Sequence, residues 1–207
     1  GICMDMSKSY RAAAKKYLPE VAIVFDRFHV MQLATKAIDK VRCKHQASLD
    51  EEGKKTLKGS RFLFLSNYEN LDENKKIRLT ELLEVNEALL IMHTMKEQLR
   101  LLWIKGNRKN GQKFLGAWIC DAIDAANNYQ AKTGIDSLKP LKTLAFTLAG
   151  HMSDLLNYFD YPITNGKAEG INNKIKTLKR QAYGYRYIAY FKLRLYHLHT
   201  SRYRLCG

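Results

Sequence analysis

A continuous run of five apolar residues at positions 21–25, Val-Ala-Ile-Val-Phe, constrains the fold of this chain more than any other feature. Its β-branched side chains and the Asp26 that closes it are typical of a short strand buried on both faces. Residues 1–4 form a second short apolar segment, and Ser7 is a good N-cap for a helix that runs through residues 11–18. Strand, helix and strand in this order predict a βαβ unit, in which the two strands are parallel and adjacent.

Two acidic residues follow the predicted strands directly, Asp5 after the first and Asp26 after the second. Both therefore fall at the carboxyl edge of the sheet, which is where open α/β sheets bind their ligands. Asp and His are both metal ligands, and Asp26 is followed at a spacing of three by His29. Structural alternatives are favoured for each residue taken alone: a cap or turn former for Asp5, and a His29 that supports the site by hydrogen bonding to a carboxylate or the backbone.

The β signal stops after Phe28, and the middle of the chain predicts helices. Apolar residues recur at three- and four-residue spacing over residues 30–49, and Asp72 and Pro140 mark two further helix starts. Residues 53–70 are ambiguous, whereas Gly106 and Gly111 indicate a loop. The other predicted helices cover residues 86–103, 114–123 and 140–159. The fold class is therefore α/β and mainly helical, with a large all-helical insertion.

A carboxylate opens a basic helix near the end of the chain. Glu169 lies in the first turn of a predicted helix over residues 169–180, where the helix dipole favours an ionised carboxylate by about 0.3–1 kcal/mol. Helical spacing places amides and cations on roughly the same face, which suits a site where metal ions meet a phosphate backbone. They are Asn172, Asn173, Lys176 and Arg180. The ordinary alternative is a first-turn acid that makes i,i+4 pairs.

The charge of the chain points to a polyanionic partner. Its 207 residues carry a formal net charge of +15, and residues 160–207 hold ten Lys or Arg against two acids. Such an excess favours nucleic acid, although a solvated basic surface is the plain alternative. At 46% hydrophobic residues the chain can bury a core. It has no bilayer-spanning apolar run, no leader and no paired cysteines, so we expect a cytoplasmic protein without a membrane partner.

A cluster of aromatic residues follows the basic helix. Tyrosines and a phenylalanine alternate with arginines around a glycine turn and a last predicted helix over residues 187–199. Such rings stack on exposed bases in some nucleic-acid-binding proteins, but they more often form a core or an interface. Both interpretations stay open.

Three runs of the sequence are specific enough to indicate a family. They are MDMSKSY with LPEVAIVFDRFHV, then NYFDYPITNGKAEGINNKIKTLKRQAYGYR, and finally YFKLRLYHLH. These runs closely resemble the ISL-three (ISL3) group of bacterial insertion-sequence transposases, enzymes of the DDE type. LKGSRFLFLSN and LLEVNEALL fit the same pattern between them, so the resemblance covers essentially the whole chain.

The resemblance implies a ribonuclease H-like catalytic core with a helical insertion before the last catalytic residue. Residues 1–30 correspond to part of that core, residues 31–160 to the insertion, and residues 161–207 to the catalytic and closing helices. Asp5 matches the second metal-binding Asp of the triad and Glu169 matches the final Glu. Asp26 and His29 match an element that we expect to support the active site. The candidate DNA-binding residues are Asn173, Lys174, Lys176, Lys179, Arg180 and Arg186.

The implied activity is metal-dependent phosphoryl transfer that cleaves and joins DNA strands at insertion-sequence ends. The complete site would hold two Mg²⁺ or Mn²⁺ ions, and the partners would be double-stranded DNA, both transposon ends and target, and further copies of the protein. The implied location is the bacterial nucleoid. Because the chain begins at Gly1, after the position of the first catalytic Asp, we expect a C-terminal portion that is inactive alone. The alternatives are a non-catalytic basic nucleic-acid-binding protein and an inactive remnant.

Overall fold

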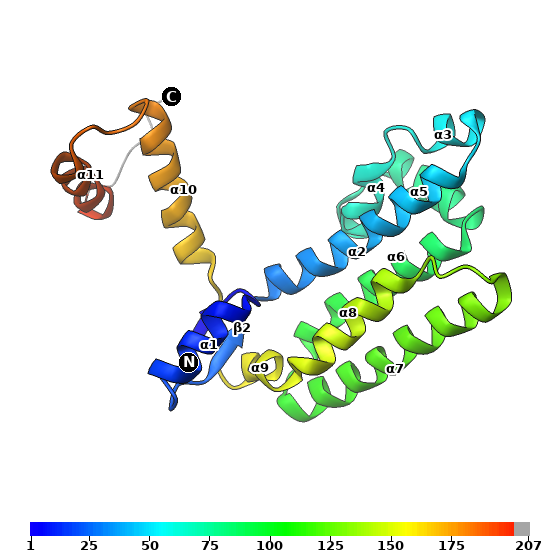
Figure 1. Cartoon of the computed structure of the whole chain (residues 1–207), viewed down its shortest axis with the longest axis horizontal. Helices are drawn as coiled ribbons and strands as arrows, with labels where there is room; N and C mark the ends of the chain where they lie inside the picture. The colour runs from blue at the N-terminus through cyan, green and yellow to red at the C-terminus, as the bar shows by residue number, and fades with distance from the viewer. Residues whose placement is uncertain (201–207) are drawn as a thin grey trace. The chain divides into compact units, whose positions relative to one another are not determined.

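The computed structural model describes residues 1–200, apart from the side chains of residues 167 and 198–200. The chain divides into two compact units, Gly1–Ile163 and Thr164–Gly207. The position of one unit relative to the other is not determined (Figure 1).

The first unit opens with the predicted βαβ element. β1 (Ile2–Met4) and β2 (Ile23–Phe25) pair in parallel, with Ile2 opposite Ile23 and Met4 opposite Phe25. α1 (Lys8–Tyr17) connects them. Ser7 occupies the N-cap of α1 as predicted, but its side chain makes no capping hydrogen bond. The parallel pair is confirmed, and among the described residues it is the whole of the sheet.

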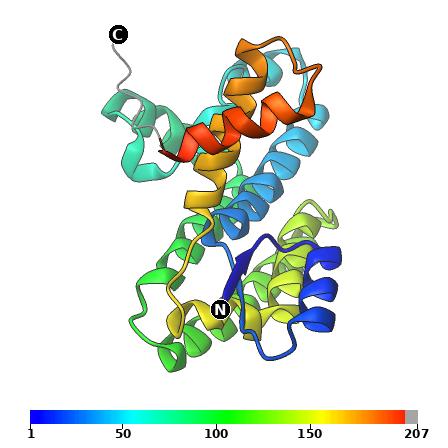
Figure 2. The same cartoon turned by 90° about the vertical axis from the view of Figure 1, so that its left-hand side faces the viewer.

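A bundle of helices makes up the rest of the first unit. α2 (Arg27–Ser48) packs against α6 (Glu87–Arg100) and α8 (Lys139–Gly150), and α7 (Arg108–Thr133) packs against α6 and α8 (Figures 1 and 2). The shorter elements are α3 (Glu51–Leu57), α4 (Arg61–Leu65), η1 (Tyr68–Asn70), α5 (Glu73–Glu84), η2 (Leu101–Ile104), α9 (Met152–Leu156) and η3 (Asn157–Phe159). The mainly helical class is thus confirmed.

The structure resolves one ambiguous stretch in the middle of the chain and corrects one interpretation there. Residues 53–70 are ambiguous in sequence, and they contain most of α3, all of α4 and η1; the Asp50 carboxylate caps α3 by accepting the Gly53 N–H. Gly111 lies inside α7 and not in a loop, because the Asn107 side chain starts that helix by accepting the Asn110 N–H. No helix in the part of the chain that the structure describes is long and apolar enough to cross a membrane.

Gly111 is required by close packing. A Cβ at this position would overlap the ring of Phe159, whose Cζ would lie 2.7 Å away, whereas a Cβ at Gly116 on the same helix meets nothing within 4 Å. We therefore expect Gly111→Ala to lower the free energy of unfolding by about 1–2 kcal/mol, because overpacking outweighs the better helix propensity of Ala. Gly116→Ala is the matched control and should raise it by about 0.5–1 kcal/mol. Urea unfolding measures both, and equal effects of the two changes would contradict the packing argument.

Up to residue 200, the second unit consists of two helices joined by a tight turn. α10 (Gly166–Gln181) and α11 (Ile188–Thr200) flank Tyr183 and Gly184, whose φ angles are 49° and 100°. The Tyr185 and Phe191 ring centroids lie 4.9 Å apart. The predicted helix, glycine turn and helix are confirmed.

Candidate active site

Asp5 lies at the carboxyl edge of the sheet, and one of its two carboxylate oxygens accepts a hydrogen bond. Its Oδ1 accepts the Ser7 N–H at 3.0 Å, which orders the turn into α1. Among the residues that the structure describes, Oδ2 has no hydrogen-bond partner. The side chain therefore combines the structural role of a turn former with a carboxylate oxygen available to a ligand.

Asp26 stands beside Asp5 on the same edge, since its N–H donates to the Met4 carbonyl at 3.0 Å. Its side chain is 4% exposed. Oδ1 caps α2 by accepting the Phe28 N–H at 2.7 Å, and Oδ2 lies 3.9 Å from the Cys3 sulfur. This carboxylate joins the start of α2 to both strands.

Two histidines near this edge have buried ring nitrogens. Nδ1 of His29 and Nδ1 of His151 have no hydrogen-bond partner among the described residues, so the expected bond from His29 is not made through Nδ1. His151 packs edge-on against Phe25, with ring centroids 5.2 Å apart. Burial, together with the charge of Arg11, lowers the pKa of His151 below its usual range.

Sequence reasoning missed His151 because it has no ligand spacing to another histidine. It follows α8, far along the chain from the strands. Its neighbour in the structure is the ion pair between Arg11 of α1 and Asp154 of α9, whose Nε and Oδ2 atoms lie 2.6 Å apart. Only the packing of α9 on β2 brings this group to the sheet.

Glu169 lies in the first turn of α10, and its side chain is exposed. Its N–H donates to the Asn165 carbonyl at 2.9 Å, which places it inside the helix as predicted. Its carboxylate is therefore accessible, at the helix end where the dipole favours a negative charge.

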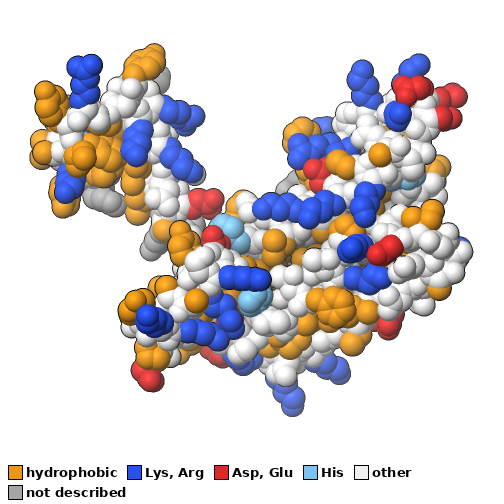
Figure 3. Space-filling model, viewed as in Figure 1, with side chains coloured by type: hydrophobic (Ala, Val, Ile, Leu, Met, Phe, Trp, Pro, Cys, Tyr) orange, Lys and Arg blue, Asp and Glu red, His pale blue; other side chains and the backbone are white. Residues whose placement is uncertain are grey.

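The candidate DNA-binding residues of the second unit are exposed. They are Asn173, Lys174, Lys176, Lys179, Arg180 and Arg186. Lys and Arg side chains gather along α10 in Figure 3. Lys179 also has a structural contact, because its Nζ lies 5.1 Å from the centre of the Phe191 ring.

The donor chemistry of these residues suits a hard cation. Carboxylate oxygens are the ligands that Mg²⁺ and Mn²⁺ prefer, and Asp5 and Glu169 each offer one group of this kind. No three His, Cys, Asp or Glu side chains are grouped closely enough to hold a metal ion within the described residues. Asp5 belongs to the first unit and Glu169 to the second.

A family model and a curated relative both relate this chain to transposases. Residues 1–195 match a family described as transposase, of the DDE type and the ISL3 group. The chain is also 33% identical over 197 residues to the transposase for insertion sequence element IS1001 of Bordetella parapertussis, an alignment that covers 94% of this chain and 46% of the relative. The chain thus spans about half the length of the curated relative it matches. No solved structure matches it.

Proposed function

The chain belongs to the ISL3 family of DDE transposases, and on that premise we propose that it forms the C-terminal part of an enzyme that cleaves and joins DNA strands at insertion-sequence ends. The observation that carries the proposal is the carboxyl edge of the parallel strand pair. Open α/β sheets bind their ligands at this edge. There the Oδ1 atom of Asp5 accepts the Ser7 N–H, and its Oδ2 atom is available to a ligand.

Each site residue has a proposed role. Asp5 and Glu169 are the metal-binding carboxylates, and Asp26 and His29 support them through the start of α2. The cations and the amide of α10, with Arg186 beyond it, hold the DNA backbone. Residues 1–30 and 161–207 belong to a ribonuclease H-like core, and residues 31–160 form its insertion. The first catalytic Asp comes from outside this chain, so this chain alone is inactive.

The chemistry of the complete enzyme is phosphoryl transfer. Two bound Mg²⁺ or Mn²⁺ ions supply activation of the attacking oxygen and stabilisation of the leaving oxygen. Asp5 and Glu169 would hold these ions in position, while the α10 side chains orient the DNA strand for in-line attack. The protein acts in the cytoplasm on double-stranded DNA at the nucleoid, as an oligomer of its own chain.

A metal titration distinguishes this function from that of a basic nucleic-acid-binding protein, which the exposed cations of α10 also support. The full-length transposase, incubated with DNA carrying the insertion-sequence ends, should cleave only when Mg²⁺ or Mn²⁺ is added. It should bind that DNA in EDTA as well, because backbone contacts need no metal. Gel electrophoresis reports cleavage, and fluorescence anisotropy reports binding. Binding with no cleavage at any metal concentration would favour the non-catalytic alternative.

A further inference from the structure

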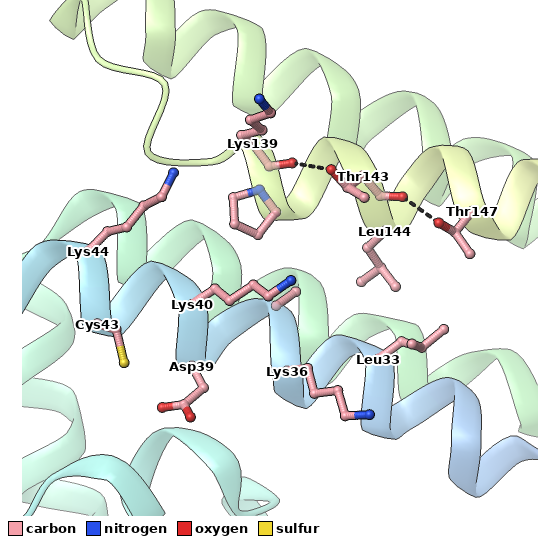
Figure 4. Close-up of a pocket in the computed structure, with 12 residues that line it drawn as sticks. Leu33, Lys36, Asp39, Lys40, Cys43, Lys44, Lys139, Thr143, Leu144 and Thr147 are labelled. Atoms are coloured by element: carbon pink, nitrogen blue, oxygen red, sulfur yellow. Dashed lines mark hydrogen bonds between the residues drawn. The ribbon is translucent and has the colours of Figure 1, made fainter.

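A groove with four lysines lies between two helices of the first unit, α2 and α8. Its volume is about 660 Å³, and its floor includes Leu33 and Leu144. Three of the lysines, Lys36, Lys40 and Lys44, follow one another along α2, and Lys139 at the start of α8 lies across from them (Figure 4). We call this feature the lysine groove.

The positive charge of the lysine groove is not neutralised within the described part of the chain. All four lysines are exposed, and none makes an ion pair there. Among the described residues, the only acid that lines the groove is Asp39, which binds Arg42 and Arg61 at 2.8 and 3.0 Å. Partial burial by itself raises the pKa of Asp39, but hydrogen bonds from the two arginines outweigh it and hold that pKa below its usual range. Asp39 is therefore ionised and already paired.

The hydroxyls of the groove do not offset this charge either. Thr143 and Thr147 donate to carbonyls of their own helix, at 2.9 Å to Lys139 and 2.7 Å to Thr143 (Figure 4). The lysine ammonium groups are thus the main polar groups that the groove offers to a ligand, and each ammonium has three donors. Such a lining selects an anion with several charges.

The spacing of the α2 lysines favours a ligand with regularly repeated charges. The three lysines are four residues apart, which sets them about 6 Å apart along one face of the helix. Successive phosphates along a nucleic-acid strand have a separation of the same order. Lys139 lies on the opposite wall of the groove, on α8. A nucleic-acid strand that lies along the groove would therefore have the three α2 lysines on one side and Lys139 on the other.

The direction of α2 connects the groove to the candidate active site. The helix begins at Arg27, directly after Asp26 at the carboxyl edge of the sheet. Lys36 is ten residues further on, about 15 Å along the helix. Lys and Arg side chains gather along α2 in Figure 3, so DNA that follows this helix leads toward the edge where Asp5 lies.

We propose that the lysine groove binds the phosphate backbone of double-stranded DNA at a distance from Asp5. The choice of DNA as the polyanion rests on the proposed function. The groove is a second backbone site, separate from α10, and it gives the helical insertion a role in holding DNA.

The test compares two variants of the chain that lose the same charge. One replaces Lys36, Lys40, Lys44 and Lys139 by Gln, and the matched control replaces Lys55, Lys58, Lys109 and Lys113 by Gln, which are exposed lysines of the same unit outside the groove. Affinity for a DNA duplex is measured by anisotropy in EDTA over a range of salt concentrations. Circular dichroism confirms that both variants fold.

The groove variant should bind at least about tenfold more weakly at 0.1 M salt, and its log–log salt slope should be shallower by about 0.9 for each phosphate that the groove no longer neutralises. In the control variant, both the affinity and the salt slope should change much less. A variant with Arg at the four groove positions should keep the salt slope of the unsubstituted chain because the charge is kept. Equal effects of groove and control variants, or an unchanged affinity of the groove variant, would overturn the proposal. Because the assay contains no metal, that failure is separate from a failure of catalysis, which appears as absent cleavage by the unsubstituted enzyme.

Discussion

Replacing Glu169 by Gln in the full-length transposase is expected to abolish metal-dependent strand cleavage while DNA binding survives. A metal-binding carboxylate that becomes an amide loses its charge, and the metals supply several kcal/mol of transition-state stabilisation. Each 1.36 kcal/mol is tenfold in rate, so the cleavage rate should fall by at least about a thousandfold. Asp5→Asn should have the same effect, because we place both carboxylates in one site.

The control for this prediction is another acid in the first turn of a helix. Glu52 of α3 is exposed, like Glu169, and it lies outside the candidate site. Glu52→Gln should leave cleavage within about twofold, since a surface change of this kind alters stability by about 0.5 kcal/mol at most. Single-turnover cleavage assays with saturating DNA measure all three variants. Retained cleavage in the Glu169 or the Asp5 variant would remove that residue from the catalytic site.

A second large effect is expected from a buried lysine of the helical insertion. Lys96 of α6 is 1% exposed, and its Nζ donates to the Phe64 and Ser66 carbonyls at 2.9 and 2.6 Å. The same atom lies 3.0 Å from the Glu97 carboxylate. Burial lowers the pKa of Lys96 below its usual range, although Glu97 opposes that shift. This ammonium therefore holds the end of α4 against α6.

Lys96→Met should lower the free energy of unfolding by about 3–5 kcal/mol. Met fills a similar volume, but the change leaves two carbonyls without the ammonium that they accept from and removes one of the two cations that pair with Glu97, the other being Arg100. Lys132→Met is the matched control, because Lys132 also pairs with a glutamate, Glu87, at 2.9 Å but at the surface. That pair should contribute no more than about 1 kcal/mol. Urea unfolding compares the two, and a loss of less than about 1 kcal/mol in the Lys96 variant would contradict the account.

The start of the fold could be predicted from the sequence because its pattern is local. An apolar β-branched run, a short amphipathic helix and closing acids specify a βαβ unit, and the register then brings Asp5 and Asp26 to one edge. The helix start at Asp72 was also predicted correctly, and the Asp72 side chain accepts the Lys75 N–H as an N-cap.

The features that escaped sequence reasoning depend on contacts between distant segments. Gly111 indicated a loop, yet it lies inside α7, and it is a glycine because Phe159 packs against it from the end of the same unit. Lys139 is remote in sequence from the lysines of α2, and only the packing of α8 on α2 brings them into one groove. His151 comes near the sheet through the packing of α9, for the same reason. Periodicity identifies helices, but it does not say which of their faces meet.

The central claim is that Asp5 and Glu169 bind the same metal site. The most direct test is a cryo-electron microscopy structure of the full-length transposase on its DNA with Ca²⁺, which fills such sites. The account predicts that an oxygen of Asp5 and an oxygen of Glu169 both lie within about 2.3–2.6 Å of bound cations in one site. A site in which Asp5 or Glu169 does not coordinate a bound cation would contradict the claim.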